Sequence, residues 1–191
     1  MAKLVLASAS PRRQGLMEML GFNFTIVPSN INEEEYKDLN PIDMVKDLAR
    51  AKAEEIAGLV EDTVVIGSDT IVVLDDKILG KPSDQSEAMA ILKKLQNRKH
   101  SVLTGIAVWD TVSGKVLVDY DKTDVFMGSI KDEDILEYVK TDEPMDKAGA
   151  YGIQGIGGIF VEKIEGSYFT VMGLPIHKLV KMLKGFDISV F

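Results

Sequence analysis

The chain has 191 residues, of which 46% are hydrophobic and 27% charged, as expected for a folded domain with an apolar core. It has no cysteine, which excludes disulfides, thiolate nucleophiles and cysteine-based zinc sites. The net charge is −8 without a basic stripe, which argues against a nucleic-acid polymer as partner. The apolar run at residues 4–7 is short for an export signal, and no run is long enough to span a membrane, so we expect a cytoplasmic protein.

The residue pattern predicts alternating strands and helices in the first half of the chain. The expected elements are a strand at 4–7, a helix at 11–20 capped by Ser10, a strand at 22–27, a polar loop at 28–39 and a helix from Pro41 to about Gly58. An apolar run at 63–74 follows, interrupted by Gly67-Ser68-Asp69-Thr70.

The second half predicts a short strand before Gly80, a helix at 84–96, a hairpin of strands at 101–110 and 115–127, a helix at 132–139, a glycine-rich loop at 148–158, a strand at 159–164 and a helix at 175–183. Strict β-α-β alternation is missing. We therefore expect an α/β fold with a mixed sheet and flanking helices. No linker is visible, so residues 1–191 are expected to form a single domain.

Two adjacent arginines break the usual charge preference of a helix. Arg12 and Arg13 lie in the first turn of the expected helix, where the helix dipole favours acids. Together with free backbone N–H groups and the hydroxyls of Ser8 and Ser10, they would form an anion site. The alternative is that both arginines are solvated and that Ser10 is only a cap.

Lys52 falls in the middle of an apolar helical stripe. At about 100° per residue, it shares a face with Val45, Leu48, Ala49 and Ile56. A lysine at this place must snorkel to water, pair with a carboxylate or meet an anion in a cleft. Snorkelling is typical of the margin of a stripe, so a functional role is favoured.

Asp69 interrupts a run that otherwise reads as a buried strand. A buried carboxylate needs a cation, a metal or water as partner, and Gly67 would let a ligand or backbone come close. The alternative is a turn between two strands, with Asp69 capping it.

Two further residues are weak signals by themselves, because Lys81 could be a solvated turn lysine and Gln154 could lie in a flexible loop.

The inventory of chemistry is carboxylates, a few cations and glycine-rich turns. His100 and His177 are far apart, and no nucleophile elbow or zinc motif is present. Any metal would be a hard cation such as Mg²⁺ or Mn²⁺ held by carboxylates. This set suits metal-assisted attack of water on a phosphoanhydride.

Five motifs in one order resemble the Maf family of nucleoside triphosphate pyrophosphatases. They are S-A-S-P-R-R at 8–13, A-K-A at 51–53, G-S-D-T at 67–70, G-K-P at 80–82 and Y-G-I-Q-G at 151–155. The resemblance implies a fold with an elongated mixed sheet and two lobes around a central cleft, as in the inosine triphosphate pyrophosphatases. It also implies a link to septum formation.

The resemblance implies roles for individual residues. Asp69 would accept a proton from the attacking water, and Glu33 and Asp69 would hold a divalent metal. The triphosphate would be bound by Ser8, Arg12, Arg13, Lys52 and Lys81.

Members of the family that act on dTTP and UTP carry Arg, Thr and Gln at the positions of Arg12, Thr70 and Gln154. Because this chain has all three, the resemblance implies a dTTP/UTP pyrophosphatase. A Gln amide can both donate to and accept from a pyrimidine edge.

Two rival hypotheses are a purine pyrophosphatase acting on ITP or XTP and a nucleotide-sensing regulator of cell division without catalysis. The long hairpin could supply a homodimer surface.

Overall fold

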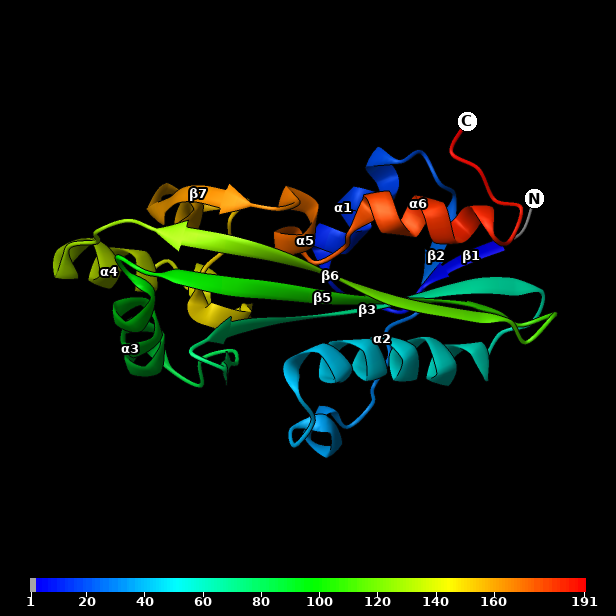
Figure 1. Cartoon of the computed structure of the whole chain (residues 1–191), viewed down its shortest axis with the longest axis horizontal. Coiled ribbons are helices and arrows are strands. Elements are labelled where there is room, and N and C mark those ends of the chain that lie inside the picture. The colour runs from blue at the N-terminus through cyan, green and yellow to red at the C-terminus, as the bar shows by residue number, and fades with distance from the viewer. Residues whose placement is uncertain (1–2) are drawn as a thin grey trace. The chain divides into compact units, whose positions relative to one another are not determined.

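A computed structural model describes residues 3–191 (Figure 1). The first elements are β1 (Lys3–Leu6), α1 (Pro11–Met19), β2 (Phe24–Ile26), the 3₁₀ turn η1 (Glu33–Tyr36), α2 (Pro41–Ala57), β3 (Thr63–Leu74), β4 (Lys77–Leu79) and α3 (Gln85–Leu95). They are followed by β5 (Lys99–Asp110), β6 (Val116–Met127), α4 (Asp132–Val139), the 3₁₀ turns η2 (Glu143–Asp146), η3 (Ala148–Ala150) and η4 (Ile156–Phe160), β7 (Val161–Glu165), α5 (Tyr168–Met172) and α6 (Ile176–Lys184).

The described strands form one mixed sheet, which confirms the predicted α/β class. Its order is β2-β1-β3-β5-β6-β7, with β4 paired to β3. β1 is parallel to both β2 and β3, whereas β4 runs antiparallel to β3 and β7 antiparallel to β6. Among residues 3–191, no helix combines the length and the apolar character needed to cross a membrane.

The chain divides into two compact units. Unit 1 contains the described residues up to Asp69 together with 104–121 and 173–191, and unit 2 contains 70–103 and 122–172. In unit 1, α2 lies on one side of the sheet and α1 and α6 lie on the other (Figure 1). In unit 2, apolar residues of α3 and α4 pack with the ends of the long strands, including Val72, Val102 and Val125.

Two glycines allow α2 to lie directly against the sheet. A Cβ atom at Gly67 of β3 would collide with the backbone of Ala49 and Ala53, and one at Gly105 of β5 would collide with the backbone of Val45. The expectation that Gly67 admits close backbone approach is therefore confirmed. The helix that approaches is the one that carries Lys52.

Most of the predicted element boundaries hold, with three main differences. The run at 63–74 is one continuous strand, so the turn considered at Asp69 is wrong. Residues 156–160 form a 3₁₀ turn, which delays the start of β7 to Val161, and α5 was not expected.

Helix capping follows the prediction at α2 but not at α1. The Asn40 side chain accepts a hydrogen bond from Asp43 N at 3.1 Å, and Pro41 occupies the first turn. Ser10 occupies the cap position of α1, but its side chain makes no capping hydrogen bond. Instead, its backbone N–H donates to Ser8 Oγ at 3.3 Å, so its expected capping role is corrected.

Candidate active site

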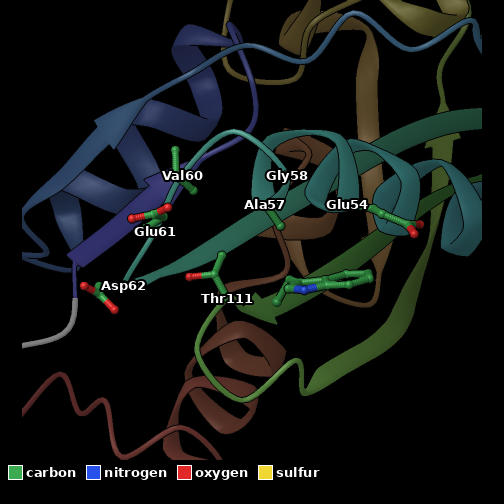
Figure 2. A pocket seen from close by; sticks show the side chains of 8 residues that line it. Glu54, Ala57, Gly58, Val60, Glu61, Asp62 and Thr111 are labelled. Atoms are coloured by element: carbon green, nitrogen blue, oxygen red, sulfur yellow. The ribbon is translucent and has the colours of Figure 1, made fainter.

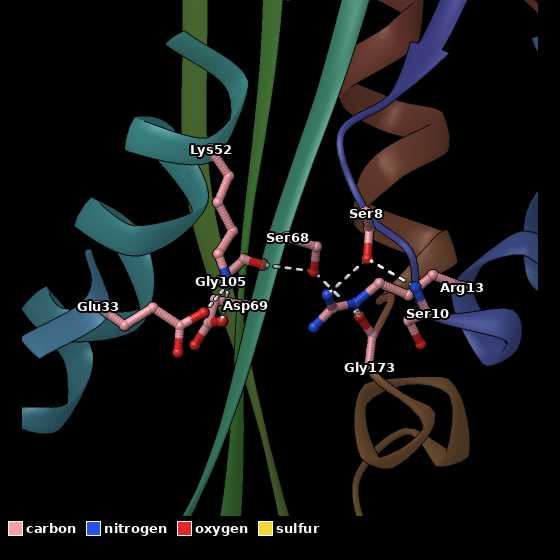
Figure 3. A network of polar contacts seen from close by, with 9 residues as sticks. All are labelled: Ser8, Ser10, Arg13, Glu33, Lys52, Ser68, Asp69, Gly105 and Gly173. Carbon is pink, nitrogen blue, oxygen red and sulfur yellow. Dashed lines mark hydrogen bonds and ion pairs between the residues drawn. The ribbon is translucent and has the colours of Figure 1, made fainter. Parts of the chain in front are cut away.

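Lys52 is the centre of a buried ion cluster on unit 1. Its Nζ donates to Asp69 Oδ1 and to Glu33 Oε1, each at 2.6 Å (Figure 3). The Lys52 and Asp69 side chains are 11% and 10% exposed, whereas that of Glu33 is 55% exposed. Pairing with carboxylates, and not snorkelling to water, is therefore how the lysine in the apolar stripe is accommodated.

Three elements bring this cluster together. Lys52 lies on α2, Asp69 on β3, and Glu33 opens η1 in the loop that precedes α2. The close packing of α2 on β3 shortens the distance that the lysine side chain must span. Asp69 thus has a cationic partner, as its place in an apolar strand predicts.

Arg13 and Ser8 form a second cluster in unit 1. Arg13 Nη1 donates to Ser8 Oγ at 3.0 Å, and Arg13 Nε donates to Gly173 O at 2.7 Å. Figure 3 shows this cluster and the Lys52 cluster on opposite sides of β3. Arg13 is therefore held in a fixed orientation beside the turn that opens α1, and the fully solvated alternative is wrong for it.

The charges of the two clusters influence each other. Burial lowers the pKa of the Arg13 guanidinium, Asp69 acts to raise it, Arg12 lowers it further, and Glu33 raises it. The net shift is downward. A guanidinium nevertheless stays protonated at neutral pH, so the site keeps its positive charge.

Ser68 links the second cluster to the neighbouring strand. Its buried hydroxyl lies 2.8 Å from Gly105 O and 3.0 Å from Gly173 O, both of which can accept its proton. Gly173 O thus accepts from both Ser68 and Arg13. Successive side chains of a strand point to opposite faces, so Ser68 and Asp69 serve the two clusters separately.

The other candidate residues lie in unit 2, apart from Arg12. Arg12 is half-buried beside Arg13 on α1. Thr70 follows Asp69 on β3 and is half-buried, whereas Lys81 and Gln154 are exposed in loops. The two loops are connected near their bases, because Gly149 N donates to Gly80 O at 3.1 Å.

Glu33 and Asp69 are the carboxylates expected to hold a metal. Both contact the same Lys52 nitrogen, so the two carboxyl groups lie close together, with one oxygen of each engaged by the ammonium. Among residues 3–191, no group of three or more histidine, cysteine or acidic side chains is placed to bind a metal ion. A Mg²⁺ ion is commonly held by one or two carboxylates plus substrate phosphates, so this pair fits such a cation.

Sequence reasoning missed three residues that shape the site. Ser68 lies inside a quoted motif but had no assigned role. Gly105 interrupts an apolar strand in the same way as Gly67, and that signal could have revealed it. Gly173 acts through its carbonyl oxygen, 160 positions from Arg13, and no local pattern encodes this contact.

A hollow of about 470 Å³ elsewhere on unit 1 has the wrong charge for a triphosphate. It lies at the C-terminal end of α2, where Glu54, Glu61 and Asp62 line it together with Trp109 (Figure 2). None of the nine candidate residues lines it. Carboxylates and a helix C-terminus repel polyanions, so the candidate site is the Lys52 and Arg13 region.

Comparison with known proteins gives full-length matches. A dTTP/UTP pyrophosphatase of Pelotomaculum thermopropionicum is 46% identical over 190 residues, covering 100% of both chains. A dTTP/UTP pyrophosphatase of Thermoanaerobacter sp. (strain X514) is 50% identical over 183 residues, covering 95% of each chain. A solved HAM1 protein from Coxiella burnetii aligns with 97% of this chain and 100% of its own at 14% identity and a TM-score of 0.49.

The family assignment rests on nearly the whole length of the sequence. The model of the Maf family, described as Maf-like protein, matches residues 3–186. The residues of both clusters described above fall inside this match. The chain belongs to the Maf-like protein family.

Proposed function

We propose that this chain hydrolyses dTTP and UTP to the nucleoside monophosphate and pyrophosphate. Its relatives carry the name dTTP/UTP pyrophosphatase and align with it almost from end to end. The structural observation that carries the proposal is the Lys52 ammonium buried between Asp69 and Glu33. An acidic chain that keeps a buried lysine beside two carboxylates has a charged site suited to a phosphoanhydride.

Asp69 is the proposed proton acceptor. It takes a proton from a water molecule whose oxygen attacks the α-phosphorus of the triphosphate. The new bond joins this oxygen to the α-phosphorus, and the bond to the oxygen bridging the α- and β-phosphorus breaks. Pyrophosphate leaves with that oxygen, so water and the triphosphate are converted to the monophosphate and pyrophosphate.

Cationic and hydroxyl groups hold the triphosphate in this proposal. Arg13 is pre-oriented by Ser8 and by Gly173 O, which lowers the entropy lost when phosphate binds. Developing negative charge on the leaving pyrophosphate is stabilised by fixed cations. The proposed triphosphate ligands are Ser8, Arg12, Arg13, Lys52 and Lys81.

Glu33 and Asp69 would hold the divalent cation, Mg²⁺ or Mn²⁺. Such a cation supplies charge neutralisation to the triphosphate when bound. Lys52, which contacts both carboxylates, balances their negative charge. The neutralised carboxylates then repel the incoming polyanion less.

Selection of the pyrimidine is assigned to Arg12, Thr70 and Gln154. Gln154 is exposed in the loop between Gly152 and Ile156, where its amide can both donate and accept. A base edge that offers one donor and one acceptor matches this amide. This part of the proposal extends the substrate names of the relatives to this chain.

The proposal is tested with the variant Asp69→Asn. Loss of the proton acceptor should lower kcat by roughly a thousandfold, with the fold intact by circular dichroism. Formation of dTMP and pyrophosphate from dTTP with Mg²⁺ or Mn²⁺ is the readout. Asp75→Asn is the matched control, because Asp75 is exposed in the turn after β3 and pairs with Arg98. Near-normal turnover of Asp69→Asn would remove Asp69 from this role.

A panel of triphosphates separates the proposal from its rivals. Preference for ITP or XTP over dTTP and UTP would contradict the pyrimidine assignment. Tight binding of dTTP without products would favour a nucleotide-sensing regulator.

A further inference from the structure

The glycine-rich loop at 152–158 is built around one carboxylate, that of Glu143. Glu143 Oε2 accepts from Ile156 N at 2.9 Å, and Oε1 accepts from Gly157 N at 3.0 Å and from the Tyr138 hydroxyl at 2.9 Å. The two N–H groups open the 3₁₀ turn η4, where backbone donors have no partner within the turn. Tyr138 Oη in turn accepts from Gly152 N at 3.3 Å.

The glycines of this loop make room for the carboxylate and its tyrosine. A Cβ atom at Gly155 would lie 2.5 Å from each carboxylate oxygen of Glu143. A Cβ atom at Gly157 would collide with the Tyr138 hydroxyl. The loop is therefore packed tightly on Glu143 and Tyr138, and its glycine content reflects contact instead of flexibility.

Buried aromatic rings fix both ends of the loop. Tyr151 precedes it and bonds His100 Nε2 through its hydroxyl at 2.8 Å. Phe160 follows it and meets the Tyr138 ring edge-on, with ring centroids 5.1 Å apart. All four side chains are buried. The segment that presents Gln154 is thus held at both ends and in the middle.

The Glu143 carboxylate is charged at neutral pH. Partial burial acts to raise its pKa, but hydrogen bonds from Gly157, Ile156 and Tyr138 outweigh burial and leave the pKa below its ordinary value. An ionised acceptor makes stronger hydrogen bonds than a neutral one. The bonds from Ile156 and Gly157 hold the backbone after Gln154, and the bond from Gly152 N to Tyr138 Oη holds the backbone before it.

We propose that Glu143 and Tyr138 are positioning residues that set the selectivity for pyrimidine triphosphates by holding the loop of Gln154. This inference rests on the proposed function, in which Gln154 contacts the base. Gln154 contributes its exposed side chain, whereas Glu143 and Tyr138 fix the backbone from which that side chain projects. In this proposal, both act through the loop backbone and not by contact with the substrate.

The test compares Glu143→Gln with the unchanged enzyme. A glutamine places an NH₂ group where a carboxylate oxygen accepts a backbone N–H, so one of these hydrogen bonds is lost. We expect KM for dTTP to rise roughly tenfold, with kcat changed less than about threefold, because contacts to the base are the same in the ground and transition states. The ratio of kcat/KM for dTTP to that for dATP should fall by a similar factor. An unchanged KM and ratio would overturn the proposal.

Tyr138→Phe is the second variant, and it keeps the two backbone hydrogen bonds to Glu143. It should shift KM in the same direction but by a smaller factor. If Glu143→Gln does not fold, Tyr138→Phe still tests whether the loop of Gln154 is positioned by these two residues. Glu137→Gln is the matched control. Glu137 is an exposed acid of α4, and its side chain pairs with Lys140. It should leave both KM and the ratio unchanged.

A double-mutant cycle separates positioning from a general structural effect. In a Gln154→Ala background, Glu143→Gln should change KM for dTTP by less than about twofold, because the residue through which it acts is gone. An equal loss in both backgrounds would overturn the proposal. Failure of the proposed function looks different, since the unchanged enzyme would then form no dTMP and pyrophosphate, or Gln154→Ala alone would leave selectivity intact.

Discussion

His100 is a buried imidazole in unit 2 whose protonation opposes folding. It is 2% exposed, and its Nε2 lies 2.8 Å from the Tyr151 hydroxyl. Its Nδ1 is buried and makes no hydrogen bond with any described residue. Burial lowers the pKa of His100 from 6.5 to about 4, and Asp124 opposes this only in part. The imidazole is therefore uncharged at neutral pH.

This histidine predicts a specific pH dependence of stability. Below pH 6.5 the unfolded chain binds a proton at this ring, whereas the folded chain does so only near pH 4, so stability falls as the pH is lowered through this range. The loss of unfolding free energy is on the order of 3 kcal/mol. The variant His100→Gln can still bond Tyr151 but cannot titrate. Between pH 7 and pH 4, its unfolding free energy, measured by urea unfolding, should therefore fall less than that of the unchanged protein, by this same amount. Equal losses in the two proteins would contradict this account.

At the scale of elements, the contact of α2 with β3 and β5 determines where Lys52 lies. Gly67→Ala and Gly105→Ala would each force this helix away from the sheet, because the added Cβ meets backbone atoms that cannot rotate aside. We expect each variant to lose about 1–3 kcal/mol of unfolding free energy and to show a lower kcat, since Lys52 and Asp69 would separate.

Gly15→Ala is the matched control for these variants. Gly15 lies within α1, and a Cβ atom there would meet nothing within 4 Å. The change should stabilise the protein by about 0.5–1 kcal/mol and leave activity intact. Thermal unfolding and dTTP turnover measure both effects, and equal behaviour of Gly15→Ala and Gly67→Ala would refute the packing argument.

Residues that violate a local pattern could be predicted from the sequence, and contacts between distant segments could not. Lys52 and Asp69 stood out because each places a charge in an apolar segment, and they form an ion pair. Glu33 lies in a polar loop, so only the resemblance marked it. Gln154 lies in a glycine-rich loop, where it was a weak signal by itself until the resemblance gave it a role. Ser10 was assigned a cap from residue type alone, which does not determine the direction of its hydroxyl.

Backbone groups explain most of what sequence reasoning missed. The carbonyl oxygen of Gly173 orients Arg13, and any residue type offers a carbonyl. Glu143 binds backbone N–H groups that lie 13 and 14 positions later, and its sequence neighbours show no period that would reveal this. Such contacts become visible only when the fold is known.

For the whole molecule, substrate binding should be measurable as added stability. A ligand that binds only the folded chain stabilises it by about 2.7 kcal/mol at a hundred times its Kd. For a chain of this size, we expect a rise in Tm of about 5–10 °C with a dTTP analogue that cannot be cleaved between the α- and β-phosphorus. Inorganic sulfate at the same ionic strength is the control. No rise at saturating analogue would contradict binding to the folded state.

The hydrogen bond from Arg13 to Gly173 has a consequence for how the protein is made. Unit 1 is assembled from three separate stretches of chain, and the last begins at Gly173. A ribosome that has translated residues 1–172 has supplied every candidate residue, yet it has not supplied the carbonyl oxygen that orients Arg13. The anion-binding end of the site can therefore reach its final geometry only after Gly173 has been synthesised, because a shorter nascent chain lacks the acceptor that orients Arg13.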